Sequence, residues 1–303
     1  MQNLMVHTAE YKKLEIRFKD WLRLLNFEPS TVKYAPMKAR EFFGWLEQQQ
    51  IKEIESINKP VISNYFDYLK TRQNKKKGGK LSKNYLRTHL TALRKLARYL
   101  RENQERSFEV DIKLSGSPQN NITIFTKDEI RDLYNTCNTD ILGMRDRAIL
   151  AVYYGCGLRR NEGVNLDIND VLFDKNFVYV RKGKNYKERY VPMSTGVKED
   201  LQSYIDFVRP VLIKTGAKAL FLNQYGNRLG SNSMADRLQK LKEKADINKE
   251  AGLHALRHSI ATHLLQSGME LEKIKRFLGH ASLESTQIYT HIANEYLKAN
   301  ITT

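Results

Sequence analysis

The chain has 303 residues, of which 41% are hydrophobic and 28% are charged, so it has enough apolar material for folded cores in water. No apolar run is long enough to span a bilayer. The first residues lack the apolar core of a secretory signal. Two cysteines are too few for a disulfide framework. We therefore expect a cytoplasmic protein without a membrane span. Lys and Arg (51) outnumber Asp and Glu (34), for a net charge of +17, and most of this excess lies within residues 1–105. The charge favours nucleic acid as the partner over a merely basic surface.

Residues 8–105 show the three- and four-residue spacing of apolar side chains that is typical of amphipathic helices. Helix-start signals at 29–31, 58–60 and 81–82 divide this region into four helices. The sequence thus predicts an all-α first domain over 8–105, followed by a polar linker over 106–121. The loop before the fourth helix is basic, and beside DNA its lysines would contact phosphates rather than only solvent; they are Lys75, Lys76, Lys77 and Lys80.

Residues 122–303 mix helical and extended patterns. A capping-box signature begins a helix at Thr126, and two strand-like runs within 177–192 flank a glycine-containing loop, which predicts a β-hairpin. From Ser231 onward the pattern is helical again. We predict an α+β, mainly helical second domain with a small antiparallel sheet.

Four short segments carry side chains that suit one chemistry: 157–162, 182–189, 254–258 and 278–291. Attack on a phosphodiester spreads negative charge over the non-bridging oxygens, which two guanidinium groups can bind. A Lys or His can protonate the leaving oxygen, and a tyrosine hydroxyl near a base and cations can act as the nucleophile. Together these segments favour phosphoryl transfer without a metal.

Two other interpretations of the segment 254–258 deserve comparison. His254 and His258 are four residues apart, a spacing with which a helix can bind zinc. The glutamate of the metalloprotease motif is missing, and Arg257 between the histidines would repel a cation, so we expect no metal. The plainer alternative is that His254 and Arg257 only tie a helix end to nearby carbonyl groups.

The motifs G-L-R-x-x-E, G-K-x-x-K-E-R, H-x-L-R-H, L-G-H and I-Y-T-H follow one another along the chain. In this order they resemble the tyrosine recombinase (phage integrase) family, its Xer-like members in particular, over about residues 8–300. The resemblance implies a four-helix, SAM-like core-binding domain over 8–105 and a catalytic domain over 122–303. It also implies a site-specific recombinase that cleaves and rejoins DNA through a 3′-phosphotyrosyl link, without a metal, a nucleotide or another cofactor.

The resemblance assigns part of the implied site to phosphate binding. Arg159 and Arg257 would be the two phosphate-binding arginines, and His280 would hydrogen-bond the scissile phosphate. Glu162 would be a supporting carboxylate that orients the site. Arg160 makes the register ambiguous, and the glutamate three residues after Arg159 favours Arg159.

The other implied roles concern the nucleophile and the protons. Tyr289 would attack the phosphate, and His254 would act as an acid or base beside it. Lys184, in the hairpin loop, would be the general acid that protonates the 5′ oxygen. Lys182 and Lys187 are the alternatives for that role, and they are otherwise expected to contact backbone phosphates.

Some neighbouring residues receive no catalytic role. We interpret His258 and His291 as structural and Cys156 as a packed residue. Tyr296 is the nearest rival nucleophile, but it lies outside the motif.

The resemblance also implies partners and a location. Four protomers would bind double-stranded DNA that carries a specific recombination site. The free protein would not need to be a tetramer in solution. The expected location is the bacterial cytoplasm, in association with the nucleoid. Residues 290–303 would dock on a neighbouring protomer. Integration, excision, inversion and dimer resolution share one active site and differ in DNA arrangement and accessory proteins, so the choice among them stays open.

Two alternative functions remain for comparison. A type IB topoisomerase uses similar groups to relax DNA as a monomer. A DNA-binding protein that has lost catalysis is disfavoured, because none of the expected catalytic positions is substituted.

Overall fold

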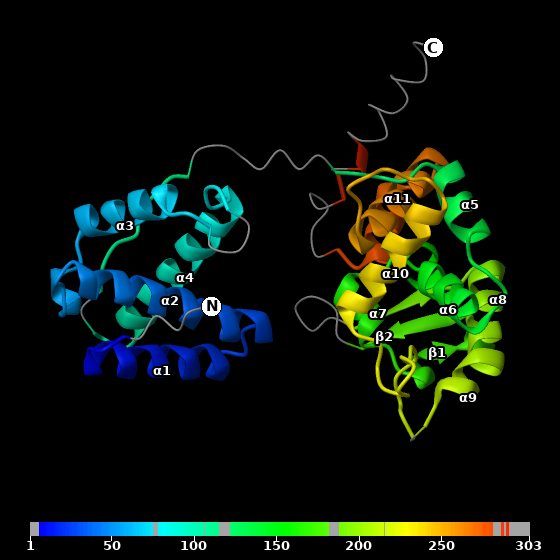
Figure 1. Cartoon of the computed structure of the whole chain (residues 1–303), viewed down its shortest axis with the longest axis horizontal. Coiled ribbons are helices and arrows are strands. Elements are labelled where there is room, and N and C mark those ends of the chain that lie inside the picture. Colours follow the sequence, from blue (N-terminus) through cyan, green and yellow to red (C-terminus); the bar gives the residue numbers. More distant parts are fainter. Residues whose placement is uncertain are drawn as a thin grey trace, which may run out of the picture. The chain divides into compact units, whose positions relative to one another are not determined.

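The computed structural model describes residues 6–74, 78–105, 107–114, 122–181, 188–214, 216–280, 286–287 and 289–290. The chain divides into two compact units, Met1–Asn120 and Asn121–Thr303 (Figure 1). No helix in the described ranges is both long and apolar enough to cross a membrane. Several residues named above lie outside the described ranges, namely Lys75, Lys76, Lys77, Lys182, Lys184, Lys187, His291 and Tyr296.

The first unit is all-α, and its helices are α1 (Ala9–Leu24), α2 (Pro29–Gln48), α3 (Lys59–Thr71) and α4 (Lys83–Glu102) (Figure 1). The predicted starts of the second, third and fourth helices are confirmed. The side chain of Asn58 accepts a hydrogen bond from the Val61 N–H at 3.1 Å, and that of Ser82 accepts one from the Tyr85 N–H at 3.2 Å. Each cap satisfies a backbone donor that the first helical turn leaves free.

The inward faces of these helices form one apolar core, in which α2 packs against both α1 and α4. The rings of Tyr11 and Phe43 stack with centroids 4.7 Å apart and so join α1 to α2. Phe108, in the segment expected to be a linker, is buried in the same core. The nearby Ser107 hydroxyl donates a hydrogen bond to the Ala97 carbonyl at 2.8 Å, so this part of the segment packs on the first unit.

The basic loop between α3 and α4 is anchored at its base. Gln73 and Lys80 pair across it as an antiparallel bridge, and Lys80 is exposed. Beside the bridge, Arg72 forms an ion pair with Glu41 at 2.6 Å, and the Tyr85 hydroxyl donates a hydrogen bond to the same carboxylate at 3.1 Å. The backbone of Lys80 is therefore held by the bridge, while its side chain is exposed to solvent.

The second unit joins helices to a small sheet. Its helices are α5 (Lys127–Asn135), α6 (Ile141–Leu150), α7 (Arg160–Val164), α8 (Thr195–Ser203), α9 (Arg209–Leu212), α10 (Ser231–Lys244), α11 (Leu253–Gln266) and α12 (Leu271–Leu278). The predicted hairpin is confirmed, because β2 (Phe177–Val180) pairs antiparallel with β3 (Arg189–Pro192). A third strand, β1 (Val171–Leu172), pairs with the other edge of β2. The predicted fold class, mainly helical with a small antiparallel sheet, is also confirmed.

In this unit, one helix start agrees with the sequence pattern and one helix break was not expected from it. The capping box expected at Thr126 is present, with the Thr126 hydroxyl and the Glu129 carboxylate each accepting the other residue's N–H. The helical pattern after Ser231 is interrupted between α10 and α11. There, Asp246 adopts a left-handed φ of 52°, a conformation that ends a helix.

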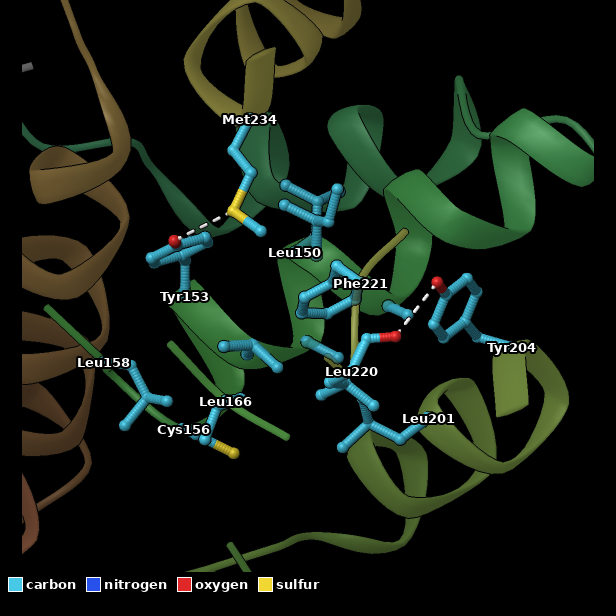
Figure 2. Close-up of a cluster of buried hydrophobic side chains, with 14 of the residues drawn as sticks. Leu150, Tyr153, Cys156, Leu158, Leu166, Leu201, Tyr204, Leu220, Phe221 and Met234 are labelled. Carbon is cyan, nitrogen blue, oxygen red and sulfur yellow. Dashed lines mark hydrogen bonds between the residues drawn. The ribbon is translucent and has the colours of Figure 1, made fainter. Parts of the chain in front are cut away.

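The core of the second unit lies between the sheet and the helices around it (Figure 2). Buried hydroxyls in this core find partners: Tyr204 donates to the Leu220 carbonyl at 3.1 Å, and Tyr153 to the Met234 sulfur at 3.1 Å. Cys156 is fully buried in the same cluster, and burial raises the pKa of its thiol to about 12. These properties fit the interpretation of Cys156 as a packed residue.

Candidate active site

Two glycines allow the motif segments to approach one another. Gly157 has a φ of 58°, and a Cβ there would lie 3.0 Å from the Leu278 side chain. Gly279 has a φ of 66°, and a Cβ there would lie 2.6 Å from Cδ of Arg189. Glycine adopts this left-handed conformation without steric cost and leaves room for both contacts. The start of β3, the end of α12 and the segment before Arg159 are therefore in direct contact.

Arg159 is the residue that caps the N-terminus of α7. Its backbone N–H donates a hydrogen bond to Oε2 of Glu162 at 2.9 Å, and its Nη1 donates to Oε1 at 2.8 Å. Its Nη2 donates to the Gly279 carbonyl at 3.0 Å, while 21% of the side chain stays exposed. Arg160 instead donates to the Asn232 side chain on α10, so Arg159 is the arginine that joins the cluster.

Glu162 is the buried anion around which the arginines gather. Arg189 donates two hydrogen bonds to its carboxylate, at 3.0 and 2.7 Å, and Nη1 of Arg257 lies 4.0 Å away. Burial opposes ionisation of this carboxylate, but the hydrogen bonds and charges of Arg189 and Arg159 outweigh it and lower its pKa to about 2. One carboxylate thus faces three guanidinium groups, and the cluster keeps a net positive charge that suits an anion.

Arg257 comes from the first turns of α11 and is 2% exposed. Its Nη1 donates a hydrogen bond to the Gly157 carbonyl, and its Nη2 donates to the Leu278 carbonyl at 2.7 Å. Burial, with repulsion from Arg159, lowers its pKa to about 9, so it is still a cation at neutral pH. These hydrogen bonds join α11 to nearby carbonyl groups. For Arg257, this agrees with the alternative prediction that the segment 254–258 ties a helix end to such groups.

Tyr289 is 1% exposed and packs on an apolar cluster formed by α11 and α12. Its hydroxyl lies 3.0 Å from Nδ1 of His258, a hydrogen-bond distance. Its ring stacks on that of His280, with centroids 6.1 Å apart and planes 16° from parallel. Nδ1 of His280 lies 2.9 Å from the Thr286 hydroxyl, so both histidines adjoining Tyr289 have a side-chain partner.

Burial and the nearby cations determine the ionisation of these three residues. The pKa of His258 is lowered to about 4, by burial first and then by His254 and Arg257. That of His280 is lowered to about 3, by burial and then by Arg257 and Arg159. Burial raises the pKa of Tyr289, and Arg257 and Arg159 oppose that increase. At neutral pH, two neutral imidazoles therefore adjoin a protonated phenol.

His254 lies at the start of α11, one turn before His258, and is exposed. The centroids of the two imidazole rings are 6.1 Å apart. Partial burial, followed by the charges of Arg257 and Arg159, lowers the pKa of His254. His254 therefore lies at the rim of the cluster, and its contacts do not include the hydroxyl of Tyr289 among the described residues.

The structure brings together the predicted site residues that it describes, namely Arg159, Glu162, His254, Arg257, His280 and Tyr289. It also adds two residues that the sequence did not assign to the site. His258, which the sequence led us to interpret as structural, is the partner of the Tyr289 hydroxyl. Arg189 occurs in the G-K-x-x-K-E-R motif, but only its contact with Glu162 reveals its place. The predicted lysines of the hairpin loop lie outside the described residues.

Comparisons with known proteins agree with this geometry. The family model described as the phage integrase family matches residues 123–295. The chain is 33% identical over 262 residues to tyrosine recombinase XerD of Staphylococcus epidermidis, covering 86% of each protein. It is 31% identical over 288 residues to tyrosine recombinase XerC of Oceanobacillus iheyensis, covering 93% of this chain and 92% of that protein.

Solved structures share the fold. The XerH site-specific recombinase, bound to a palindromic difH substrate in a post-cleavage complex, matches with a TM-score of 0.73 at 22% identity, covering 96% of this chain and 84% of XerH. At this level of identity, the match concerns the fold. The family model alone covers more than half of the sequence, and the XerC relative covers nearly all of it. The chain belongs to the phage integrase family and is an Xer-like tyrosine recombinase, a membership that supports site-specific DNA recombination as its activity.

Proposed function

We propose that the protein cleaves and rejoins DNA strands at a specific site through a covalent 3′-phosphotyrosyl intermediate on Tyr289. One observation supports this most directly: the Tyr289 hydroxyl adjoins a neutral imidazole within the electrostatic influence of Arg159 and Arg257. A phenol is a weak nucleophile until a base and cations assist it. Here the imidazole of His258 would be the base, and Arg159 and Arg257 would be the cations.

The arginine cluster is suited to bind the scissile phosphate. In the transition state, negative charge accumulates on the non-bridging oxygens, and preorganised guanidinium donors stabilise it. Glu162 holds Arg159 in place through two contacts, so this donor is positioned before the phosphate arrives. The partly exposed Arg159 would meet the phosphate, and the more deeply buried Arg257 would add its charge.

His280 would complete the phosphate site as a hydrogen-bond donor. Its lowered pKa keeps the ring neutral at neutral pH, so it carries one N–H. When the Thr286 hydroxyl donates to Nδ1, that N–H is on Nε2. A neutral His280 would then donate from Nε2 to a non-bridging oxygen. His254, at the rim of the cluster, would assist proton transfer during cleavage and religation.

Lys184 would protonate the 5′ oxygen as it leaves. The hairpin loop that carries it ends at Arg189, whose guanidinium contacts Glu162 within the arginine cluster. This connection supports a role for a lysine of that loop beside the phosphate. Lys182 and Lys187 would bind the DNA backbone in this proposal.

No metal or nucleotide is required in this proposal. The arginines neutralise the phosphate, and the phosphotyrosyl bond keeps the energy of the phosphodiester for religation. Double-stranded DNA would be the partner, and solved relatives in complex with DNA, such as XerH on its difH substrate, support this. The first unit would contribute Lys75, Lys76, Lys77 and Lys80 to the DNA backbone. Strand exchange would take place in a homo-tetramer on two sites, with accessory proteins where the biological task requires them.

A DNA substrate with a nick beside the cleavage position tests the proposal. Loss of the short fragment prevents religation, so the wild-type protein should accumulate as a covalent adduct. Tyr289→Phe should bind the DNA and form no adduct. Relaxation of supercoiled DNA without a specific site would instead favour a topoisomerase.

A further inference from the structure

The contact between His258 and Tyr289 has a plain explanation that must be weighed first. A buried hydroxyl needs a hydrogen-bond partner, and a histidine can provide one without any catalytic role. The same pattern occurs elsewhere on α11, where Nδ1 of His263 lies 2.9 Å from the Tyr154 hydroxyl. A contact distance alone therefore does not distinguish a structural pair from a catalytic one.

The surroundings distinguish the two pairs. Tyr289 lies near Arg257 and Arg159, whose charges oppose the burial effect on the pKa of its hydroxyl. For Tyr154, burial is the cause of the raised pKa. His258 also has a second imidazole, that of His254, one helical turn away. Only in the first pair do nearby cations oppose the effect of burial and favour the phenolate, with an imidazole nitrogen at hydrogen-bond distance from the hydroxyl.

We propose that His258 is a further catalytic residue, whose Nδ1 takes the proton of the Tyr289 hydroxyl during strand cleavage and returns it during religation. This inference rests on the proposed function, because it assumes that Tyr289 is the nucleophile. It gives the role of direct proton acceptor to the second histidine of the H-x-L-R-H motif, and it leaves His254 to assist proton transfer from the rim of the cluster.

Each bond that forms in this step is matched by a bond that breaks. The O–H bond of Tyr289 breaks, its proton passes to Nδ1 of His258, and the oxygen electron pair forms the bond to phosphorus. The bond from phosphorus to the 5′ oxygen breaks, and that oxygen takes a proton from the general acid. In religation the 5′ hydroxyl attacks phosphorus and returns its proton to the deprotonated general acid. The bond from phosphorus to the Tyr289 oxygen breaks, and that oxygen recovers its proton from His258.

The ionisation of His258 is compatible with this role. Its pKa of about 4 leaves the ring neutral at neutral pH, so that Nδ1 can accept a proton. A phosphate bound by Arg159 and Arg257 would bring negative charge close to the ring and stabilise the imidazolium as it forms. The site thus holds an acceptor nitrogen at hydrogen-bond distance from the Tyr289 hydroxyl before cleavage, and a bound phosphate would stabilise the charged form during it.

Two substitutions separate proton acceptance from positioning. His258→Asn keeps a hydrogen-bond acceptor near the Tyr289 hydroxyl but provides no base, and His258→Ala leaves space for free imidazole. In single-turnover cleavage of the nicked substrate, we expect each to slow adduct formation by about 100-fold or more. Added imidazole should partly restore the Ala variant. His263→Asn, which alters the comparable pair on the same helix, should form the adduct at the wild-type rate.

A substrate with a 5′-bridging sulfur identifies which proton is affected. A thiolate leaves without protonation, so this substrate should rescue Lys184→Ala and should not rescue either His258 variant. Wild-type rates in His258→Asn, or rescue of the His258 variants by the sulfur substrate, would overturn the inference. Thermal melting and DNA-binding measurements on each variant identify any loss of folding. An adduct in Tyr289→Phe would instead show that the proposed nucleophile itself is wrong.

Discussion

Arg189 donates two hydrogen bonds to the carboxylate of Glu162, although the two residues belong to different elements, β3 and α7. The same carboxylate accepts hydrogen bonds from Arg159, so it links the hairpin to a phosphate-binding arginine of the proposed site. Nε of Arg189 is buried and has no hydrogen-bond partner among the described residues. The two hydrogen bonds to Glu162 are therefore the main polar contacts that position this guanidinium group. Glu162 is therefore expected to act on both stability and catalysis.

Glu162→Gln should lower the free energy of unfolding by about 3 kcal/mol, because it leaves buried guanidinium groups without their counter-charge. Urea unfolding measured by circular dichroism gives this value. Glu105→Gln is the matched control, since Glu105 pairs with Arg17 nearer the surface, where the two side chains are 27% and 50% exposed, and it should cost at most about 1 kcal/mol. Equal losses in the two variants would show that the arginine cluster does not depend on Glu162.

Gly279→Ala should reduce adduct formation by about 10-fold or more through displacement of Arg189. The added Cβ would lie 2.6 Å from Cδ of Arg189, and the φ of 66° would itself strain an alanine. Single-turnover cleavage at saturating protein measures the effect. Gly196→Ala, at the start of α8 with nothing within 4 Å of the new Cβ, should cleave at the wild-type rate. A Gly279→Ala variant that also cleaves normally would argue against the role of this close approach.

The lowered pKa of His258 predicts a loss of stability in mild acid. Below about pH 6.5, the unfolded chain binds a proton at this residue, while the folded chain does so only near pH 4. Stability is therefore lost as the pH falls through this interval, by up to about 2 kcal/mol at pH 5 from this residue. Urea unfolding at pH 7 and pH 5 should show a smaller difference for His258→Asn than for the wild type. The same difference in both proteins would contradict the assignment.

Removal of divalent metal should leave the cleavage rate unchanged. Arg159 and Arg257 supply the positive charge that a metal ion supplies in other phosphoryl-transfer sites. The measurement compares adduct formation with EDTA and with added Mg²⁺ at equal ionic strength. Activity that disappears with EDTA and returns with Mg²⁺ would show that the arginines alone are insufficient.

Local signals in the sequence predicted much of the fold. The caps at Asn58, Ser82 and Thr126 each depend on a side chain and a backbone group three residues away, so a short window contains both partners. Strand β1 was not predicted, because its two residues are too few to show an alternating pattern and it forms by pairing with β2. Helix breaks such as that at Asp246 likewise depend on one residue's backbone conformation.

The candidate site likewise has residues that the sequence indicated and contacts that only the packing reveals. Chemistry restricts which residue types can bind phosphate or attack it, and the resemblance of the motifs to the family assigned those roles to Arg159, Arg257 and Tyr289. The contacts of Arg189 with Glu162 and of His258 with Tyr289 join residues 27 and 31 positions apart, which no helical or strand periodicity relates. Only the packing of β3 and α7, and of Tyr289 on α11, brings these pairs together.

The central claim is that Tyr289 attacks the DNA. The most direct measurement is to trap the wild-type protein on the nicked substrate, digest the adduct with a protease and a nuclease, and identify the modified peptide by mass spectrometry. We predict a nucleotide-linked phosphotyrosine at Tyr289 and no modified peptide from Tyr289→Phe. A phosphodiester link at another residue, such as Tyr296, or an adduct that persists in Tyr289→Phe, would contradict the account.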